Sequence, residues 1–208
     1  MIEEPAEHHR RSIGLPGYDY SAPGSYFITI CAHGRQCIFG EVVDGEMRLN
    51  EVGKIVWEVW NSLPARYPQI VLGVAVVMPN HFHAIITIDD PAEPVGAIHE
   101  LPLRGPSSQR ELPLRGSPEH ELRQRDADDA PEISDRIRRR KMLLPMAVGY
   151  LKMNSAKQIN HLLNSAGNPV WQRNYFEHII MTEKEYLAIE AYIENNPANW
   201  VGDSLYAP

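Results

Sequence analysis

Residues 70–88 read IVLGVAVVMPNHFHAIITI, and this stretch decides the fold. Ile70 to Met78 is a nearly unbroken apolar run of strand length, and His81 to Ile88 is a second run after the dipeptide Pro79-Asn80. Apolar runs of this length, separated by turn residues, are typical of strands that are buried on both faces. We therefore predict two adjacent, antiparallel central strands joined by a tight turn.

The segments before this stretch indicate one more strand, a hairpin and a helix. Asp44-Gly45 is a strong signal for a tight hairpin turn. Asn50 can cap a helix whose apolar residues recur at helical spacing until Pro64 ends it. In chain order, the predicted elements are a strand at Tyr26–Ala32, hairpin strands at Cys37–Val43 and Glu46–Leu49, and a helix from Asn50 to Leu63.

The C-terminal part of the chain indicates two more helices. Met146 to Leu163 carries an apolar stripe at helical spacing, whereas Val170 to Met181 is ambiguous. Thr182, followed three residues later by Glu185, is a capping-box signature for a helix that runs to about Asn196. The order of these elements predicts an α+β fold. We expect an antiparallel sheet with helices on one face, close to a ferredoxin-like arrangement.

Residues 91–141 differ in composition from the sequence around them. They are rich in Pro, Arg, Asp, Glu and Ser, contain no aromatic residue, and repeat Glu-Leu-Pro-Leu-Arg-Gly at 100–105 and 111–116. Such a segment buries too little apolar surface to offset the entropy of ordering. We predict a flexible, disordered insertion in one domain over 1–208, with folded parts at about 15–90 and 145–202.

Charge and hydropathy limit the classes of protein to which the chain can belong. No apolar run approaches the roughly 20 residues that cross a bilayer, so we expect no membrane segment. The only cysteines, Cys31 and Cys37, have no second pair to complete a thiolate metal site, and reduced thiols suit a cytoplasmic protein.

The net charge of −7 over 208 residues argues against a protein that coats nucleic acid without specificity, because such binding depends on Lys and Arg. A local basic surface can still contact DNA while acidic residues lie elsewhere. The candidate basic residues are Arg10, Arg11, the run Arg136 to Lys141, Lys152, Lys157 and Arg173.

His81 and His83 are the first candidates for chemistry. Alternate side chains of a strand share a face, so both imidazoles point one way while Phe82 points into the opposite layer. Two imidazoles at this spacing can chelate one divalent ion. The alternative is a pair of exposed histidines at a strand end.

Tyr192 and Asn196 are four residues apart and therefore lie on one face of the predicted helix. A phenol has a pKa of about 10, so it acts as a nucleophile only beside a metal that polarises its target. The alternative is structural: Tyr192 packs against Tyr186 or Ile189, and Asn195 or Asn196 caps the helix.

Five motifs in order resemble the REP-associated tyrosine transposases, a branch of the single-strand transposases of the insertion-sequence 200/605 superfamily. The resemblance covers about Leu15 to Asp90 and Pro145 to Gly202, nearly everything except the insertion. The motifs are Leu15-Pro-Gly-Tyr-Asp-Tyr20, Tyr26-Phe-Ile-Thr-Ile30, Val77-Met-Pro-Asn-His-Phe-His83, Val170-Trp-Gln-Arg-Asn-Tyr-Phe-Glu-His178 and Tyr192-Ile-Glu-Asn-Asn-Pro197.

This resemblance implies a HUH nuclease in which His81, His83 and Asn196 bind Mg²⁺ or Mn²⁺. Tyr192 matches the nucleophile, which attacks a phosphodiester in single-stranded or hairpin DNA, forms a 5′-phosphotyrosine link and releases a 3′-hydroxyl. The resemblance also implies a cytoplasmic, nucleoid-associated bacterial protein that acts as a monomer or a homodimer.

Several other residues have both a DNA-binding and a structural interpretation. Trp171, Arg173 and His178 could stack bases and hold phosphates, but Trp171 and Phe176 could equally anchor the core. Lys152 and Lys157 are phosphate contacts or merely solvated helix positions.

Two departures from the family leave other functions open. Gly73 stands where relatives often carry an acidic residue, and Met181 stands where they often carry a basic one. These departures are compatible with a catalytically impaired DNA-binding protein or repressor. A small metallohydrolase that uses His81 and His83 is a third hypothesis, although the sequence offers it no obvious general base.

Overall fold

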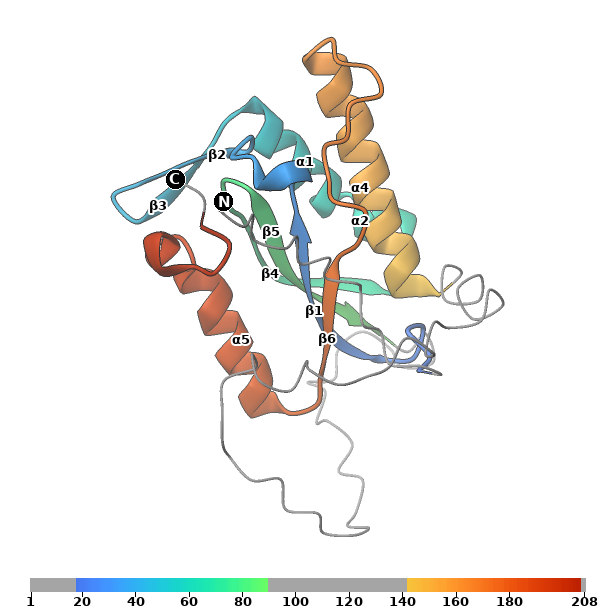
Figure 1. The fold of residues 1–208 in the computed structure, drawn as a ribbon. Coiled ribbons are helices and arrows are strands. Elements are labelled where there is room, and N and C mark those ends of the chain that lie inside the picture. Colours follow the sequence, from blue (N-terminus) through green and yellow to red (C-terminus); the bar gives the residue numbers. More distant parts are fainter. Residues whose placement is uncertain (1–17, 90–141, 207–208) are drawn as a thin grey trace, which may run out of the picture.

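The protein is seen in a computed structural model that describes residues 18–89 and 142–206, arranged as a sheet with helices packed on it (Figure 1). The predicted insertion, Arg10, Arg11 and the run Arg136 to Lys141 lie outside these residues. The elements are β1 (Gly24–Cys31), η1 (His33–Arg35), β2 (Gly40–Val43), β3 (Glu46–Leu49), α1 (Glu51–Asn61), α2 (Leu63–Arg66), β4 (Ile70–Val77), β5 (His81–Ile88), α4 (Leu143–Leu162), β6 (Phe176–Ile180), α5 (Glu183–Asn195) and η2 (Trp200–Gly202).

The main sheet has four strands in the order β4-β5-β1-β6, and every neighbouring pair is antiparallel. With α1 and α4 between the strands, this is the ferredoxin-like order, and the α+β prediction is confirmed. β4 and β5 are adjacent, as predicted, and the Met78 amide closes their turn on the carbonyl of His81 at 2.8 Å. However, β4 lies at the edge of the sheet. It is apolar on both faces because helices cover both of them.

α1 and α4 cover one face of the sheet and form the larger core. Phe82, Ala84 and Ile86 of β5 point into this core, where the ring of Phe82 lies 5.2 Å from that of Trp60 of α1. The cap predicted for α1 is present, since Asn50 accepts hydrogen bonds from the amides of residues 52 and 53. Pro64 lies in the first turn of α2, so its missing N–H costs no helical hydrogen bond.

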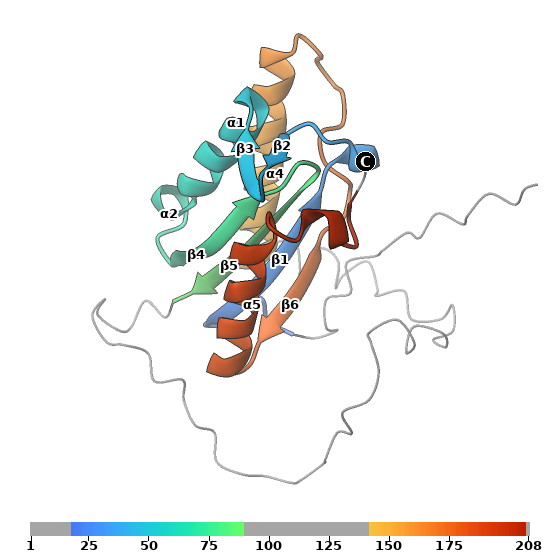
Figure 2. The same ribbon diagram turned by 90° about the vertical axis from the view of Figure 1, so that its left-hand side faces the viewer.

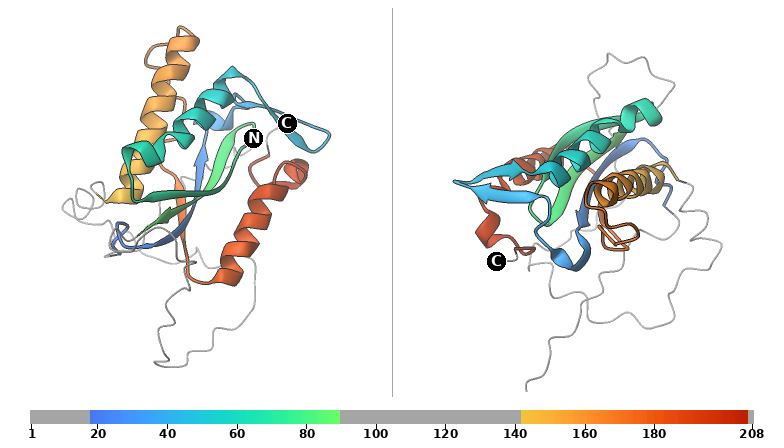
Figure 3. Two further views of the ribbon diagram at one scale, coloured as in Figure 1. Left: turned by 180° about the vertical axis from the view of Figure 1, so that it is seen from behind. Right: turned by 90° about the horizontal axis from the view of Figure 1, so that it is seen from above.

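α5 covers the opposite face, which corrects the prediction that all helices lie on one face (Figures 2 and 3). Ile193 of α5 is buried with Ile85 of β5 and Ile180 of β6, and Val74 and Val76 of β4 pack against this cluster. The reason is that this face is apolar as well. Burying an aliphatic side chain contributes about 1.5–3 kcal/mol, so the C-terminal helix covers the face.

Two local predictions on the C-terminal side are refined by the structure. α4 begins at Leu143, three residues before the predicted start, and β6 accounts for part of the ambiguous segment.

The hairpin β2–β3 forms a separate two-stranded sheet around Asp44 and Gly45, both of which have positive φ. Among the described residues, no helix combines the length and the apolar character needed to cross a membrane.

Candidate metal and nucleophile site

The four residues predicted to carry the chemistry meet on the α5 face of the sheet. His81 and His83 project from β5, and their ring centroids are 4.4 Å apart. Tyr192 lies on α5, with its hydroxyl 3.2 Å from Nε2 of His83. Asn196 caps the same helix, is 3% exposed, and affects the pKa values of both His81 and Tyr192. One chain therefore brings the imidazoles, the phenol and the carboxamide together.

Asn80 determines which nitrogen of His81 carries the proton. The Nδ2 group of Asn80 donates to the carbonyl oxygens of Leu205 at 2.8 Å and Arg35 at 3.3 Å. Its Oδ1 therefore faces Nδ1 of His81 at 2.8 Å, and an amide oxygen can only accept. Nδ1 of His81 is consequently the donor, and Nε2 carries the lone pair that points into the site.

That Nε2 atom and Oδ1 of Asn196 are both buried without a hydrogen-bond partner. Two buried acceptors cannot satisfy each other, and leaving such groups unpaired is costly. A protonated imidazole could donate to Asn196, but His81 is not protonated at neutral pH. Burial lowers the pKa of His81 to about 4, although Asp203 and Asn196 oppose the shift. A cation between the two lone pairs would satisfy both, so the donors fit a metal ion.

His83 is held by residues of β1 and α5. Its Nδ1 lies 2.8 Å from Oγ1 of Thr29, the residue paired with it across the sheet, while its Nε2 faces the phenol of Tyr192. Burial, and then the neighbouring His81, lowers the pKa of His83 well below its usual value, and a hydrogen bond that the ring donates to the backbone of Ile28 opposes this. Both imidazoles are therefore neutral near pH 7, the form in which histidine binds metals.

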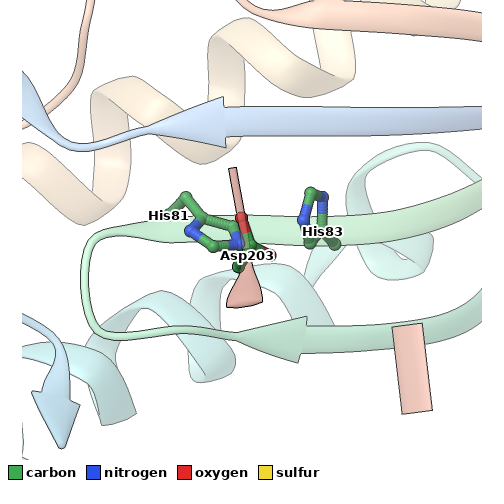
Figure 4. A group of neighbouring side chains, drawn as sticks. All are labelled: His81, His83 and Asp203. Carbon is green, nitrogen blue, oxygen red and sulfur yellow. The ribbon is translucent and has the colours of Figure 1, made fainter. Parts of the chain in front are cut away.

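Asp203 completes the cluster, and the sequence analysis missed it. One side-chain ligand atom from each of His81, His83 and Asp203 lies within 4.8 Å of the others, so the group could hold a metal ion (Figure 4). Asp203 also accepts hydrogen bonds from Nδ2 of Asn196 at 2.8 Å and the amide of Leu205 at 2.6 Å. Imidazole and oxygen donors together suit a divalent ion, and the oxygens extend the choice to Mg²⁺ and Mn²⁺.

Tyr192 is protonated in this environment yet accessible. Burial raises the pKa of its phenol, Asp203 raises it further, and Asn196 acts in the opposite direction. The side chain is 45% exposed. It stands beside an open cavity of about 590 Å³, lined by Tyr192, Asn195, Asn196, Ala198, Asn199, Val201, Gly202, Asp203 and Ser204.

The residues of the predicted DNA-contacting stretch do not join this site. Trp171 is buried, its ring lies 4.7 Å from that of Phe39, and its Nε1 donates to Ser155 at 2.9 Å. These contacts favour the core-anchor interpretation of Trp171 over base stacking. Phe176, by contrast, is 50% exposed.

The basic residues that were predicted to contact DNA differ in exposure and in their hydrogen-bond partners. Lys152 donates to the carbonyl oxygens of Gln172 and Arg173, and burial lowers its pKa to about 8, so it fastens a loop instead of facing solvent. Lys157 and Arg173 are exposed. His178 is exposed but lies 2.6 Å from a carboxylate oxygen of Glu185.

Of the two departures from the family that the motifs resemble, Gly73 has a local explanation and the side chain of Met181 has none. A Cβ on Gly73 would lie 3.0 Å from Cβ of Ile85 and 3.1 Å from the hydroxyl of Tyr186. Tyr186 therefore occupies the space that a side chain at position 73 would need. Met181 is exposed, and its amide donates to Glu185 at the start of α5.

Comparison with known proteins finds one strong relative. No family model matches the chain. An uncharacterized protein of Haemophilus influenzae is 38% identical over 199 residues, which cover 96% of this chain and 94% of that protein. The chain belongs to the same family as this protein.

Solved structures with related shapes include two transposases. A REP-associated tyrosine transposase bound to a REP hairpin has 17% identity and a TM-score of 0.48, covering 88% of this chain and 72% of that chain. A Deinococcus radiodurans protein described as a candidate transposase has 15% identity and a TM-score of 0.41, covering 86% of this chain and 93% of that chain. Both TM-scores are below 0.5, so neither carries an argument about activity.

Proposed function

We propose that the protein is a transposase that cuts and rejoins single-stranded DNA, with Tyr192 as the nucleophile. One observation carries the proposal: the hydroxyl of Tyr192 lies 3.2 Å from Nε2 of His83, beside a cluster that fits a metal ion. The motif resemblance supplies the substrate class, single-stranded DNA with hairpin-forming repeats. A protein with this substrate would be associated with the bacterial nucleoid.

His81, His83 and Asn196 would hold the metal, with Asp203 beside them. The ion, Mg²⁺ or Mn²⁺, would supply Lewis-acid polarisation of the scissile phosphate. Burial and then Asp203 raise the pKa of the Tyr192 phenol, and Asn196 only partly opposes them, so the phenol must lose its proton as it attacks. The half-exposed position of the phenol gives its proton a route to solvent.

Cleavage then exchanges one phosphodiester bond for another. The Tyr192 oxygen forms a bond to phosphorus, the bond from phosphorus to the 3′-oxygen breaks, and that oxygen takes a proton from water. The products are a 5′-phosphotyrosine link and a free 3′-hydroxyl. Attack by a 3′-hydroxyl on the phosphotyrosine reverses these steps and rejoins a strand, so no external energy source is required.

Tyr192 and both histidines belong to the same chain, and α5 packs on its own sheet. We therefore propose that a monomer can cleave DNA without a helix from a partner. Mixing a Tyr192→Phe chain with a His81→Gln, His83→Gln chain tests this point. Recovery of activity in the mixture would show that the tyrosine acts across a dimer.

A covalent-adduct assay tests the nucleophile. A single-stranded oligonucleotide with a hairpin, labelled at its 3′ end because the 5′-phosphotyrosine link retains that fragment, is incubated with the protein and Mn²⁺. A labelled band at the mass of the protein plus this fragment is expected on a denaturing gel. Tyr192→Phe should abolish this band. Tyr186→Phe is the matched control, since it removes a hydroxyl from the same helix, and it should keep the band. An undiminished adduct in Tyr192→Phe excludes Tyr192 as the nucleophile.

A DNA-binding protein without cleavage is the second candidate. The observation that favours it is the bond between the phenol and His83, because it occupies the lone pair that a metal ligand needs. This candidate predicts hairpin binding in a gel-shift assay and no adduct with Mn²⁺ or Mg²⁺.

A further inference from the structure

We propose that the C-terminal turn Asp203–Leu205 is a positioning element. Through Asn80 and Asn196, it orients the two lone pairs that would face a metal ion, which lie on Nε2 of His81 and Oδ1 of Asn196. Among the described residues, no hydrogen bond joins the turn to His81 or His83. Instead, it holds Asn196 at one end and Asn80 at the other. The metal-affinity part of this inference rests on the proposed function, whereas the orientation part does not.

The first contact fixes the carboxamide of Asn196. A carboxylate only accepts hydrogen bonds, so the Asp203 oxygen at 2.8 Å requires the NH₂ group of Asn196 to face it. The amide is planar, and its oxygen must then point the other way. This oxygen is the buried atom without a partner. Asp203 thereby determines that Asn196 presents a lone pair, and not N–H groups, to the site.

The second contact fixes the ring of His81. The carbonyl of Leu205 accepts from Nδ2 of Asn80 at 2.8 Å, and Oδ1 of Asn80 consequently faces Nδ1 of His81. That oxygen accepts a hydrogen bond from the protonated Nδ1, so Nε2 is the ring nitrogen with a free lone pair. If the amide of Asn80 were reversed, its NH₂ group would face Nδ1 and the proton would move to Nε2, where it would block a metal.

Asp203 connects the two contacts. Its other carboxylate oxygen accepts from the amide of Leu205 at 2.6 Å, which holds the Leu205 carbonyl where Asn80 can reach it. The side chain of Leu205 is buried, and the ring of Trp200 lies 5.9 Å from that of His81, so the turn is also anchored by packing. One carboxylate thus orients donors that come from β5 and from the end of α5.

Asp203→Asn is the variant that separates orientation from shape. It has the same size but only one accepting atom, so it can accept from the amide of Leu205 or from Asn196, while its NH₂ group faces the other donor. Either Asn196 reverses its amide or the Leu205 amide loses its partner. Outer partners of metal ligands typically change metal affinity by about 10- to 100-fold when they are removed.

Two measurements on the full chain test the proposal. Titration with Mn²⁺, followed by calorimetry, is expected to show an affinity about 10- to 100-fold lower for Asp203→Asn than for the unmodified chain. Imidazole ¹⁵N NMR at neutral pH, without metal, is expected to show His81 protonated at Nδ1 in the unmodified chain. In Asp203→Asn, His81 should carry the proton at Nε2 in those chains in which the Leu205 amide loses its partner and Asn80 reverses. In chains in which Asn196 reverses instead, the proton stays on Nδ1 and the ¹⁵N shift of Nε2 should change, because the NH₂ group of Asn196 then donates to it.

The NMR arm distinguishes positioning from charge. Asp203→Asn removes a negative charge, which alone would weaken Mn²⁺ binding and leave the proton on Nδ1. Glu194→Gln, which removes an exposed charge from α5, is the matched control and should change neither measurement. An Nε2-protonated His81 in the unmodified chain overturns the inference, as does a folded Asp203→Asn chain in which neither the tautomer of His81 nor the ¹⁵N shift of its Nε2 changes. If no chain binds Mn²⁺ while the tautomer shifts, the positioning role stands and the metal site of the proposed function fails.

Discussion

The two faces of β5 differ in how their buried polar atoms are paired. On the α1–α4 face, Phe82 fills the core, and the nearby polar pair Ser155 and Trp171 satisfy each other. On the α5 face, His81 keeps a buried nitrogen without a partner. Native proteins pair nearly all their buried polar atoms, and the exceptions concentrate at functional sites. The contrast agrees with the proposal that one face of this sheet stabilises the fold and the other carries the chemistry.

The largest expected effect is the loss of a ring from the α1–α4 face. Phe82→Ala should lower the free energy of unfolding by about 3–5 kcal/mol, because it leaves a cavity beside Trp60. Urea denaturation followed by tryptophan fluorescence measures this. On the opposite face, His81→Gln keeps most of the volume and should cost far less stability while abolishing the DNA adduct. A larger loss of stability in His81→Gln would contradict the division between the faces.

The indole of Trp171 gives the next effect. Trp171→Phe removes the donor to Ser155, whose hydroxyl keeps its bond to the Leu151 carbonyl, so the loss is that of one buried hydrogen bond, about 0.5–1.5 kcal/mol. Because Trp171 lies on the α1–α4 side of the molecule, we expect the folded variant to form the adduct at the normal rate. Selective loss of DNA binding, with stability unchanged, would restore the base-stacking interpretation.

The alternation of β5 was sufficient to predict that His81 and His83 share a face, because a strand permits no other arrangement. The same alternation, taken with the other predictions, held an inconsistency. If Phe82 points into the core under the helices, a Tyr192 that reaches the histidines must lie on the other face. Helices on one face and a tyrosine beside the histidines were therefore incompatible, and the structure places α5 with the histidines.

Asp203 shows what periodicity cannot reveal. It follows the short helix η2, so no helical or strand spacing relates it to Asn196, and only the folded turn brings the two together. Trp171 and Lys152 show the reverse problem. A cluster of aromatic and basic residues suggests nucleic acid, but burial and bonds to backbone carbonyls are properties of the folded chain.

The cap of α5 tests how firmly the tyrosine helix must be held. Thr182 accepts a hydrogen bond from the amide of Glu185 at 3.2 Å, and replacing such a cap by alanine costs about 1 kcal/mol. Thr182→Ala should lower stability by this amount in urea denaturation and speed amide hydrogen exchange in the first turn of α5. Asn50→Ala, the equivalent change in α1, should have a similar cost without faster exchange in α5.

The hydrogen bond between Tyr192 and His83 leads to a smaller expected effect, in which a substitution strengthens metal binding. A metal ion must displace the phenol from Nε2 of His83, and a hydrogen bond of this kind is worth about 0.5–1.5 kcal/mol. Tyr192→Phe should therefore bind Mn²⁺ about 2- to 10-fold more tightly in calorimetry, while Tyr186→Phe should not change the affinity. Weaker binding in Tyr192→Phe would mean that the phenol oxygen is itself a ligand.

The smallest expected effect is a change in acid stability at the start of α5. The pKa of Glu185 is lowered by the amide of Met181 first and then by His178. A carboxylate whose pKa is lower in the folded state adds stability above its unfolded pKa, and loses it as pH falls through the folded value. Glu185→Gln should therefore flatten the decline of melting temperature below about pH 4.5, compared with the unmodified chain. Glu183→Gln, an exposed change two residues earlier in the same turn of α5, should leave that decline intact. If only Glu185→Gln changes the acid dependence, the dependence comes from the hydrogen bonds that anchor α5. If both variants change it, the dependence comes from the negative charge at the start of the helix.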